Sequence, residues 1–249
     1  MATNVYFYNP VTNTNLGFIQ ASASVNYTGI YHDGCSWYFL QKNSIDVANL
    51  YNETFYFYDT FSITGIPDYA GTLTGGIVGD GTSLFIQYES SIGAPGPVTL
   101  VSDIGEINKT TGDWINRTNR SGSIGTAKRD ITLNGSMLKT VYQAVASGTN
   151  KFAKEEIQIR TGRLIRSLAY ASDHRGIVFD GSGIFTVTAR GSVDYVTTEM
   201  VSIGPQSSAI GVGFRAMCSI LSTPLGDRME MSNIGNKKAG SMLALLRVP

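Results

Sequence analysis

The sequence contains little charge. Only 15% of its 249 residues are charged, well below the roughly 25% of an average globular protein. Basic and acidic residues number 19 each, so the formal net charge is zero, which argues against a nucleic-acid partner or an anionic-membrane footprint. Polarity comes instead from Asn, Ser, Thr and 28 glycines, a balance typical of strands and tight turns. The composition therefore favours an all-β chain.

Long apolar runs are also missing. None approaches the roughly 18 residues of a membrane span, so we expect no membrane insertion. The first six residues, 1–6, lack the basic start and apolar core of a signal peptide. We therefore expect synthesis in the cytoplasm without a secretion signal.

Cysteine and histidine are scarce as well. The two cysteines, Cys35 and Cys218, are too few for a disulfide scaffold, and a reducing site of synthesis predicts two free, buried thiols. The two histidines, His32 and His174, fall at opposite ends of the strand frame described below. We expect surface or rim histidines that share neither a metal nor a catalytic pair.

A short stretch recurs five times along the chain. It is an apolar run, then Asp-Gly or Asn-Gly in the first four copies, then a second apolar run. The copies occupy 29–34, 76–81, 130–135, 176–181 and 211–216, so their ends are 47, 54, 46 and 35 residues apart. Asp-Gly or Asn-Gly between strand-like runs is a strong hairpin signal, because a type I′ turn needs positive φ at both central residues. We predict positive φ at Gly34, Gly81, Gly135 and Gly181.

The copies predict a repeated four-stranded unit. Its strands, a to d in chain order, are joined by the hairpin a–b, a loop, and a c–d turn that resembles Thr-Gly. In the first unit, a polar loop is expected before an aromatic strand at 54–58. In the third unit, a long b–c loop is expected at 142–155. Four-stranded meanders of about 40 to 50 residues are typical of β-propeller blades, whose two buried faces explain the continuously apolar strands. A sandwich is the alternative, but it would lack a repeated frame.

The blade count is predicted to be five. The chain shows five a–b hairpins but six c–d pairs, because it begins and ends with such a pair. We expect one propeller domain over residues 1–249, with its terminal pairs closing or overhanging the ring; six blades with one abbreviated is the alternative. An overhanging pair would expose a strand edge, which is a template for another chain.

One stretch resembles a known repeat class. The residues from Ile159 through the Thr161-Gly162 turn to Ile165, and onward to Asp180-Gly181, are similar to YVTN-type propeller repeats. The resemblance covers about one repeat well and the others loosely. It implies a fold and no particular activity, because such propellers serve many functions.

No catalytic or metal-binding motif is present, so we expect no catalytic residues, no metal and no cofactor. The acids of the hairpins could form a cation-binding ring at one mouth of the channel, but Asp before Gly is what the turn itself demands. The candidate binding surface combines two connections with aromatic, basic and amide side chains. Its residues are Trp114, Arg117, Arg120, Lys128, Arg129, Tyr142 and Asn150.

These features favour a non-enzymatic structural or adhesive part of a larger assembly. We expect a virion component, such as a phage tail or capsid-associated protein, whose partners are other protein subunits. A lectin-like propeller that binds a host-surface glycan is the alternative, although it would need equivalent polar and aromatic loop residues in every blade. A propeller hydrolase is a third class, which the absence of a catalytic cluster disfavours.

Overall fold

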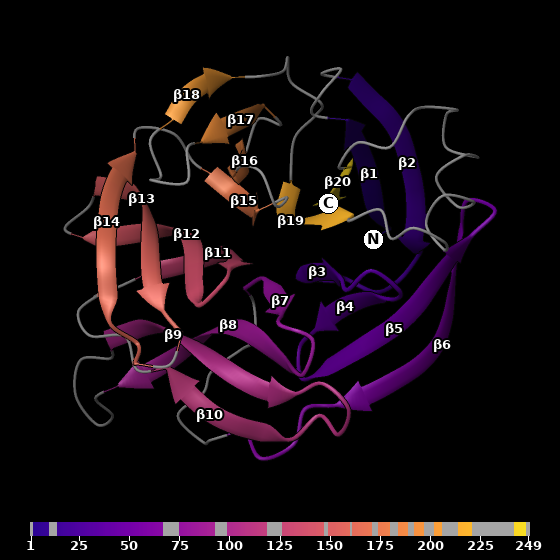
Figure 1. Ribbon diagram of the computed structural model, residues 1–249, viewed down its shortest axis with the longest axis horizontal. Coiled ribbons are helices and arrows are strands. Elements are labelled where there is room, and N and C mark those ends of the chain that lie inside the picture. The colour runs from indigo at the N-terminus through magenta and orange to yellow at the C-terminus, as the bar shows by residue number, and fades with distance from the viewer. Residues whose placement is uncertain are drawn as a thin grey trace.

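Five four-stranded antiparallel sheets surround a common axis in the computed structural model, which makes the chain an all-β, five-bladed propeller (Figure 1). The structure describes residues 2–9, 14–66, 75–92, 99–118, 126–146, 149–159, 161–170, 174–179, 184–188, 192–196, 202–205, 214–220 and 242–247. No helix long and apolar enough to cross a membrane occurs among them.

Each blade is a simple meander from the innermost to the outermost strand. Blade 1 consists of β3 (Gly29–His32), β4 (Trp37–Gln41), β5 (Ser44–Tyr51) and β6 (Thr54–Ser62). Blade 2 consists of β7 (Ile77–Gly79), β8 (Ser83–Ile92), β9 (Thr99–Asn108) and β10 (Trp114–Thr118). Blade 3 consists of β11 (Thr126–Asn134), β12 (Met137–Ala146), β13 (Thr149–Gln158) and β14 (Leu164–Tyr170). Blade 4 consists of β15 (His174–Phe179), β16 (Ile184–Thr188), β17 (Val193–Val196) and β18 (Ser202–Pro205).

The two ends of the chain build the fifth blade together. Its order is β19 (Phe214–Ile220), β20 (Met242–Arg247), β1 (Thr3–Asn9) and β2 (Thr14–Ser22). The N-terminal strands are therefore the outer pair, and Val5 lies opposite Leu246. The last strand is the second strand of its blade, so no surplus pair overhangs the ring among the described strands, and the expectation of an overhang is wrong.

The core is divided among the five junctions between neighbouring blades. The cluster between blades 5 and 1 includes Phe7 and Trp37, whereas Leu40 and Ile86 belong to the cluster between blades 1 and 2. Smaller clusters fill the junctions between blades 2 and 3, 3 and 4, and 4 and 5. Each sheet thus buries both faces, which is the physical reason for its continuously apolar strands.

The first position of the recurring stretch lies where neighbouring innermost strands approach closely. A Cβ at Gly29 would lie 3.0 Å from Ile77 of the next blade, and one at Gly76 would lie 1.8 Å from Asp130. Blade 3 carries Asp130 itself at this position. Its carboxylate accepts a hydrogen bond of 3.0 Å from the amide of Ile177 in blade 4.

The turns confirm part of the hairpin prediction. Gly34, Gly81 and Gly135 have φ of 98°, 103° and 57°, whereas Gly181 lies outside the described residues. The preceding Asp or Asn residues do not have positive φ, so the predicted type I′ turns are wrong at these three sites. At the first turn, the Asp33 carboxylate accepts hydrogen bonds from the amides of Cys35 and Ser36, at 2.8 and 2.7 Å.

Two loop predictions are wrong. The polar segment before Thr54 contains β5, in which Asp46 interrupts the apolar pattern although it is buried. The long loop expected at 142–155 is mostly strand, because β12 continues to Ala146 and β13 begins at Thr149.

A turn with positive φ at both central residues joins β5 to β6. Asn52 and Glu53 have φ of 46° and 59°, and Tyr51 pairs with Thr54 on either side of them. Asn is common at the first position of such a turn, but the second position normally carries Gly. Glu53 is thus a non-glycine residue held in the left-handed region.

Replacing Glu53 with Gly should stabilise the fold by about 1 kcal/mol, because it removes the left-handed strain of a residue that has a Cβ. Chemical denaturation of wild type and Glu53→Gly would measure the change. Glu53→Ala is the matched control, since it removes the carboxylate but keeps the strain. Equal stability of Glu53→Gly and Glu53→Ala would show that the backbone at position 53 is not strained by a Cβ.

Candidate functional site

Trp114, the aromatic residue of the predicted binding surface, packs into its own blade. Its ring lies 5.2 Å from that of Tyr88 in an edge-on contact. A Cβ at Gly105 would lie only 2.1 Å from the Trp114 ring, so the glycine makes room for the indole. Trp114 is therefore a partly buried packing residue of blade 2, and its role as a contact residue stays a prediction.

The other predicted surface residues belong to strands of two blades. Arg117 is on β10, Lys128 and Arg129 are on β11, Tyr142 is on β12 and Asn150 is on β13. The register places Lys128 directly opposite Tyr142 and Asn150 opposite Val145. Arg120 lies outside the described residues. The surface formed by this set stays a prediction.

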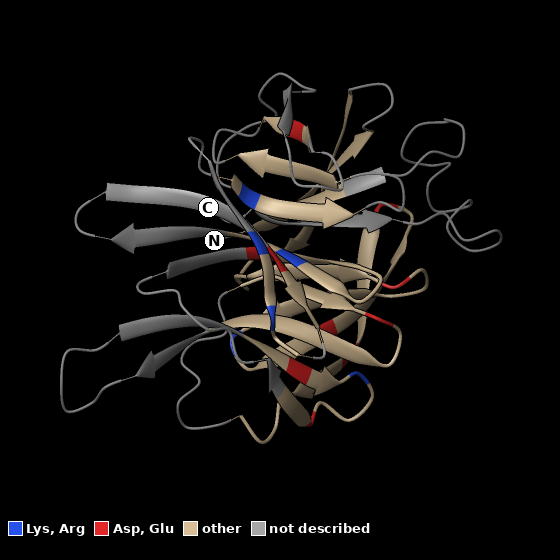
Figure 2. Cartoon of the chain, turned by 60° about the vertical axis from the view of Figure 1, so that its left-hand side comes forward, with Lys and Arg blue, Asp and Glu red and all other residues tan. Residues whose placement is uncertain are grey.

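Charged residues in the described part of the chain are spread over several strands and turns (Figure 2). No group of three or more His, Cys, Asp or Glu side chains that could hold a metal ion occurs among the described residues. Asp33 and Asp80 cap their own turns, and Asp80 accepts bonds from the amides of Thr82 and Ser83 at 3.1 and 2.9 Å. These acids therefore have the role that their turns require.

Asp46 ties blade 1 together. Its buried carboxylate accepts hydrogen bonds from Tyr27 at 2.7 Å, Gln41 at 2.8 Å and Thr60 at 2.9 Å. Burial and then the bond to Asp46 raise the pKa of the Tyr27 phenol above its usual range. The phenol therefore stays protonated and keeps donating to the carboxylate.

Blade 4 repeats this tie with a histidine. His174 Nε2 lies 3.0 Å from Asp194 Oδ2, and His174 precedes Ile177 by the same three positions that separate Tyr27 from Ile30. His174 is buried, and so is His32, whose ring packs 4.7 Å from that of Trp37. The prediction of surface or rim histidines is wrong, because the His32 ring packs in the interior and the His174 ring bonds a carboxylate there.

Cys35 is a free thiol, as predicted, but it is exposed, because it lies at the tip of the β3–β4 turn. The expectation that it is buried is therefore wrong. Cys218 lies on β19, and its side chain is outside the described part of the structure.

Asp33 also joins blade 1 to blade 2. Lys109, in the c–d turn of blade 2, forms an ion pair with Asp33 and lies 5.1 Å from the centre of the Tyr38 ring. Burial would raise the pKa of Asp33, but the Lys109 bond and the amides of Ser36 and Cys35 outweigh it and lower the pKa from 3.8 to about 2. The carboxylate therefore stays charged well into the acid range.

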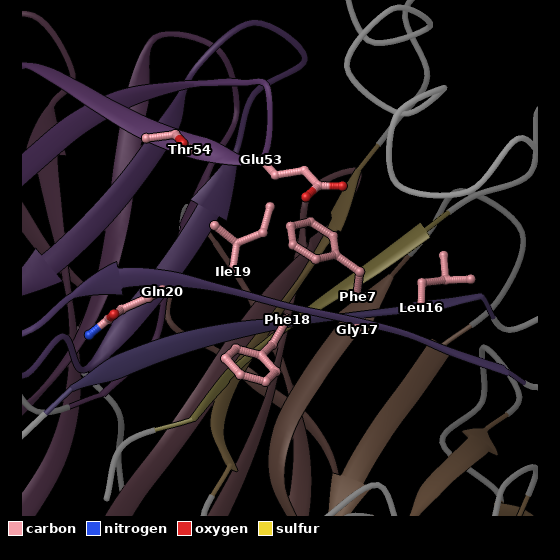
Figure 3. Close-up of a pocket in the computed structure, with 8 residues that line it drawn as sticks. All are labelled: Phe7, Leu16, Gly17, Phe18, Ile19, Gln20, Glu53 and Thr54. Carbon is pink, nitrogen blue, oxygen red and sulfur yellow. The ribbon is translucent and has the colours of Figure 1, made fainter.

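A pocket of about 430 Å³ lies at the junction of blades 5 and 1, between β2 and the β5–β6 turn (Figure 3). We call it the junction pocket. Its lining residues are Phe7, Leu16, Gly17, Phe18, Ile19, Gln20, Glu53 and Thr54.

A β-bulge shapes one wall of the junction pocket. The register steps from Phe7 opposite Gly17 to Tyr8 opposite Asn15, so Leu16 is the extra residue, and Gly17 has φ of 112°. Leu16 and Ile19 are three positions apart, so in a regular strand their side chains would point to opposite faces of the sheet. The bulge instead places Leu16 against the same apolar cluster as Ile19. The floor of the pocket is therefore apolar.

Exposed aromatic side chains lie on the β5–β6 hairpin, whose turn contributes Glu53 and Thr54 to the junction pocket. Tyr51, Tyr56 and Tyr58 are 57%, 53% and 57% exposed, and Phe57 is 39% exposed. We call these four residues the aromatic hairpin. The sequence predicts the aromatic strand at 54–58 but a loop before it; because that segment contains β5, the aromatic strand is β6, the outermost of its blade.

Comparisons with known proteins place the chain by fold alone. No family model and no curated protein matches the sequence. Hydrazine synthase of Kuenenia stuttgartiensis is similar at 14% identity and a TM-score of 0.47, over 85% of this chain and 64% of that chain. BamB of Moraxella catarrhalis is similar at 11% identity and a TM-score of 0.42, over 94% of this chain and 64% of that chain. The Dos1 propeller is similar at 8% identity and a TM-score of 0.46, over 98% of this chain and 72% of that chain.

The chain thus spans less than two thirds of the first two proteins, 64% in each case. TM-scores below 0.5 carry no argument about function. The propeller assignment rests on the chain's own sheet order.

The contribution of the Asp33–Lys109 pair to the stability of the fold should depend on pH in the acid range. Because the folded-state pKa of Asp33 lies below its unfolded value, the stability that the pair contributes is present above about pH 4 and is lost as the pH falls towards 2. Asp33→Asn and Lys109→Met should each lower stability at pH 7 by about 1.5 kcal/mol and flatten its acid dependence. Denaturation curves between pH 7 and 2 would check this, and an unchanged slope in both variants would contradict it.

Trp114→Ala should destabilise the protein by about 3 kcal/mol, because the indole fills the space over Gly105. The neighbouring Ile115 is exposed, so Ile115→Ala should change stability by no more than about 0.5 kcal/mol. Urea denaturation of both variants would compare them. A Trp114→Ala variant as stable as wild type would contradict the packing role of the indole.

Proposed function

We propose that this protein is a non-enzymatic structural or adhesive subunit of a larger assembly. The aromatic hairpin carries the proposal. Tyrosine and phenylalanine are enriched at protein interfaces, and large apolar groups gathered on a surface mark a site of interaction. Three tyrosines more than half exposed on one hairpin fit a surface that is covered in the assembled state.

The interior acids and bases support the non-enzymatic part of the proposal. Asp46, the His174–Asp194 pair and the Lys139–Glu156 pair, at 2.9 Å, each link strands or connections within a blade. These groups stabilise the sheets, because each joins two strands or a strand and a connection of the same blade. Asp33 likewise joins two blades through Lys109.

The finer proposal is a virion component, such as a phage tail or capsid-associated protein, made in the cytoplasm and bound to other protein subunits. Low charge and a sequence rich in Asn, Ser, Thr and Gly support it. The relation to YVTN-type repeats is proposed only for the stretch from Ile159 to Gly181.

Fractionation of the native source tests this function. Wild-type protein should sediment with particles, whereas a Tyr51→Ser/Tyr56→Ser variant should remain in the soluble fraction, because the exposed aromatic contacts are removed. Its circular dichroism and melting temperature should match wild type, since both side chains are exposed. Ile165→Ser is the control, because Ile165 is an exposed apolar residue on β14, in another blade.

Two results would overturn the proposal. Wild-type protein found entirely outside particles would exclude an assembly subunit. Binding of one sugar at equivalent sites in several blades on a glycan array would favour the lectin alternative.

A further inference from the structure

We propose that the junction pocket receives one arginine side chain of a partner protein, with the Glu53 carboxylate as its counter-ion. The proposal deepens the assembly function above and rests on it for the existence of the partner. Three features of the pocket carry it: its wall, its single charge and the backbone that holds that charge.

The wall suits the aliphatic part of an arginine. Leu16 and Ile19 provide apolar surface, and the bulge at Gly17 turns Leu16 towards the cluster that contains Phe7. Figure 3 shows the Glu53 side chain above the ring of Phe7, with Ile19 beside that ring. A volume of about 430 Å³ lies within the roughly 300–1,000 Å³ of ligand pockets.

The charge selects a cation. Glu53 is the one charged residue among the eight that line the pocket. Its carboxylate forms no hydrogen bond or ion pair with another residue in the part of the chain that the structure describes. A planar guanidinium can bind a carboxylate through two parallel hydrogen bonds while its stem covers apolar surface, which an ammonium does less well.

The backbone supplies an independent argument. Glu53 has φ of 59° in a turn where the second residue is normally Gly. A residue kept in a strained conformation indicates that its side chain serves a purpose, since Gly would relieve the strain. Here the strain places a carboxylate at the rim of an apolar pocket.

Nuclear magnetic resonance of ¹⁵N-labelled protein tests the site directly. N-acetyl-arginine amide is the probe, and N-acetyl-citrulline amide is its uncharged isostere. The arginine probe should shift the amide signals of β2 and the β5–β6 turn, with the citrulline probe binding about tenfold more weakly because it lacks the charge-assisted pair.

Two variants separate charge from fold. Glu53→Gln should weaken arginine binding to the level of the citrulline probe. Asp59→Asn removes a carboxylate that is exposed on β6 outside the pocket, and it should leave binding unchanged. Glu53→Gly should lose binding while it gains stability, which shows that lost binding does not come from lost fold.

Equal binding of the two probes, an unaffected Glu53→Gln variant, or no shifts at the pocket would each overturn the proposal. The test of the assembly function has a separate outcome. If wild type and Glu53→Gln both sediment with particles, the assembly role stands and the arginine site does not.

Discussion

The crowding of five innermost strands around one axis is the constraint on which the rest of this propeller depends. An innermost strand has no further strand to pair with, so its backbone groups need partners from neighbouring blades. Asp130 and Thr132 accept hydrogen bonds of 3.0 and 2.9 Å from the amides of Ile177 and Phe179, two positions apart on β15. The side chains of one blade thus replace the missing strand of the next. The close approach that permits these bonds excludes a Cβ at Gly76.

The same geometry explains where the protein can interact. Where neighbouring blades cover each other, polar groups are buried in ties within a blade, such as Tyr27–Asp46 and His174–Asp194. Farther out the blades diverge, because they are arranged radially, and the junction between the outer strands is less completely filled. The junction pocket lies between β2, an outermost strand, and the β5–β6 turn. The junction pocket and the aromatic hairpin, which carry the proposed function, therefore both lie at the periphery, where the fold leaves side chains uncovered.

Ring closure has a comparable effect on the termini. The N-terminal strands β1 and β2 complete the sheet that the C-terminal strands β19 and β20 begin, and ladder hydrogen bonds join the two ends. Opening this blade would expose apolar residues such as Phe7 at the junction with blade 1. The bulge that shapes the junction pocket lies in this closing blade, so the candidate site depends on the ring being closed.

The sequence by itself determined the class of fold. Apolar runs punctuated by Asp-Gly and Asn-Gly at a near-regular spacing are local signals, and they predicted five blades and the positive φ of Gly34, Gly81 and Gly135. Tertiary structure decided which side chains are uncovered. Asp46 and His174 are polar by type yet buried, because partners distant in the sequence satisfy them, whereas Trp114 packs over Gly105 of the neighbouring strand. Glu53 became a site residue only when the β5–β6 turn met the bulge in β2, two segments that the sequence separates and ring closure joins.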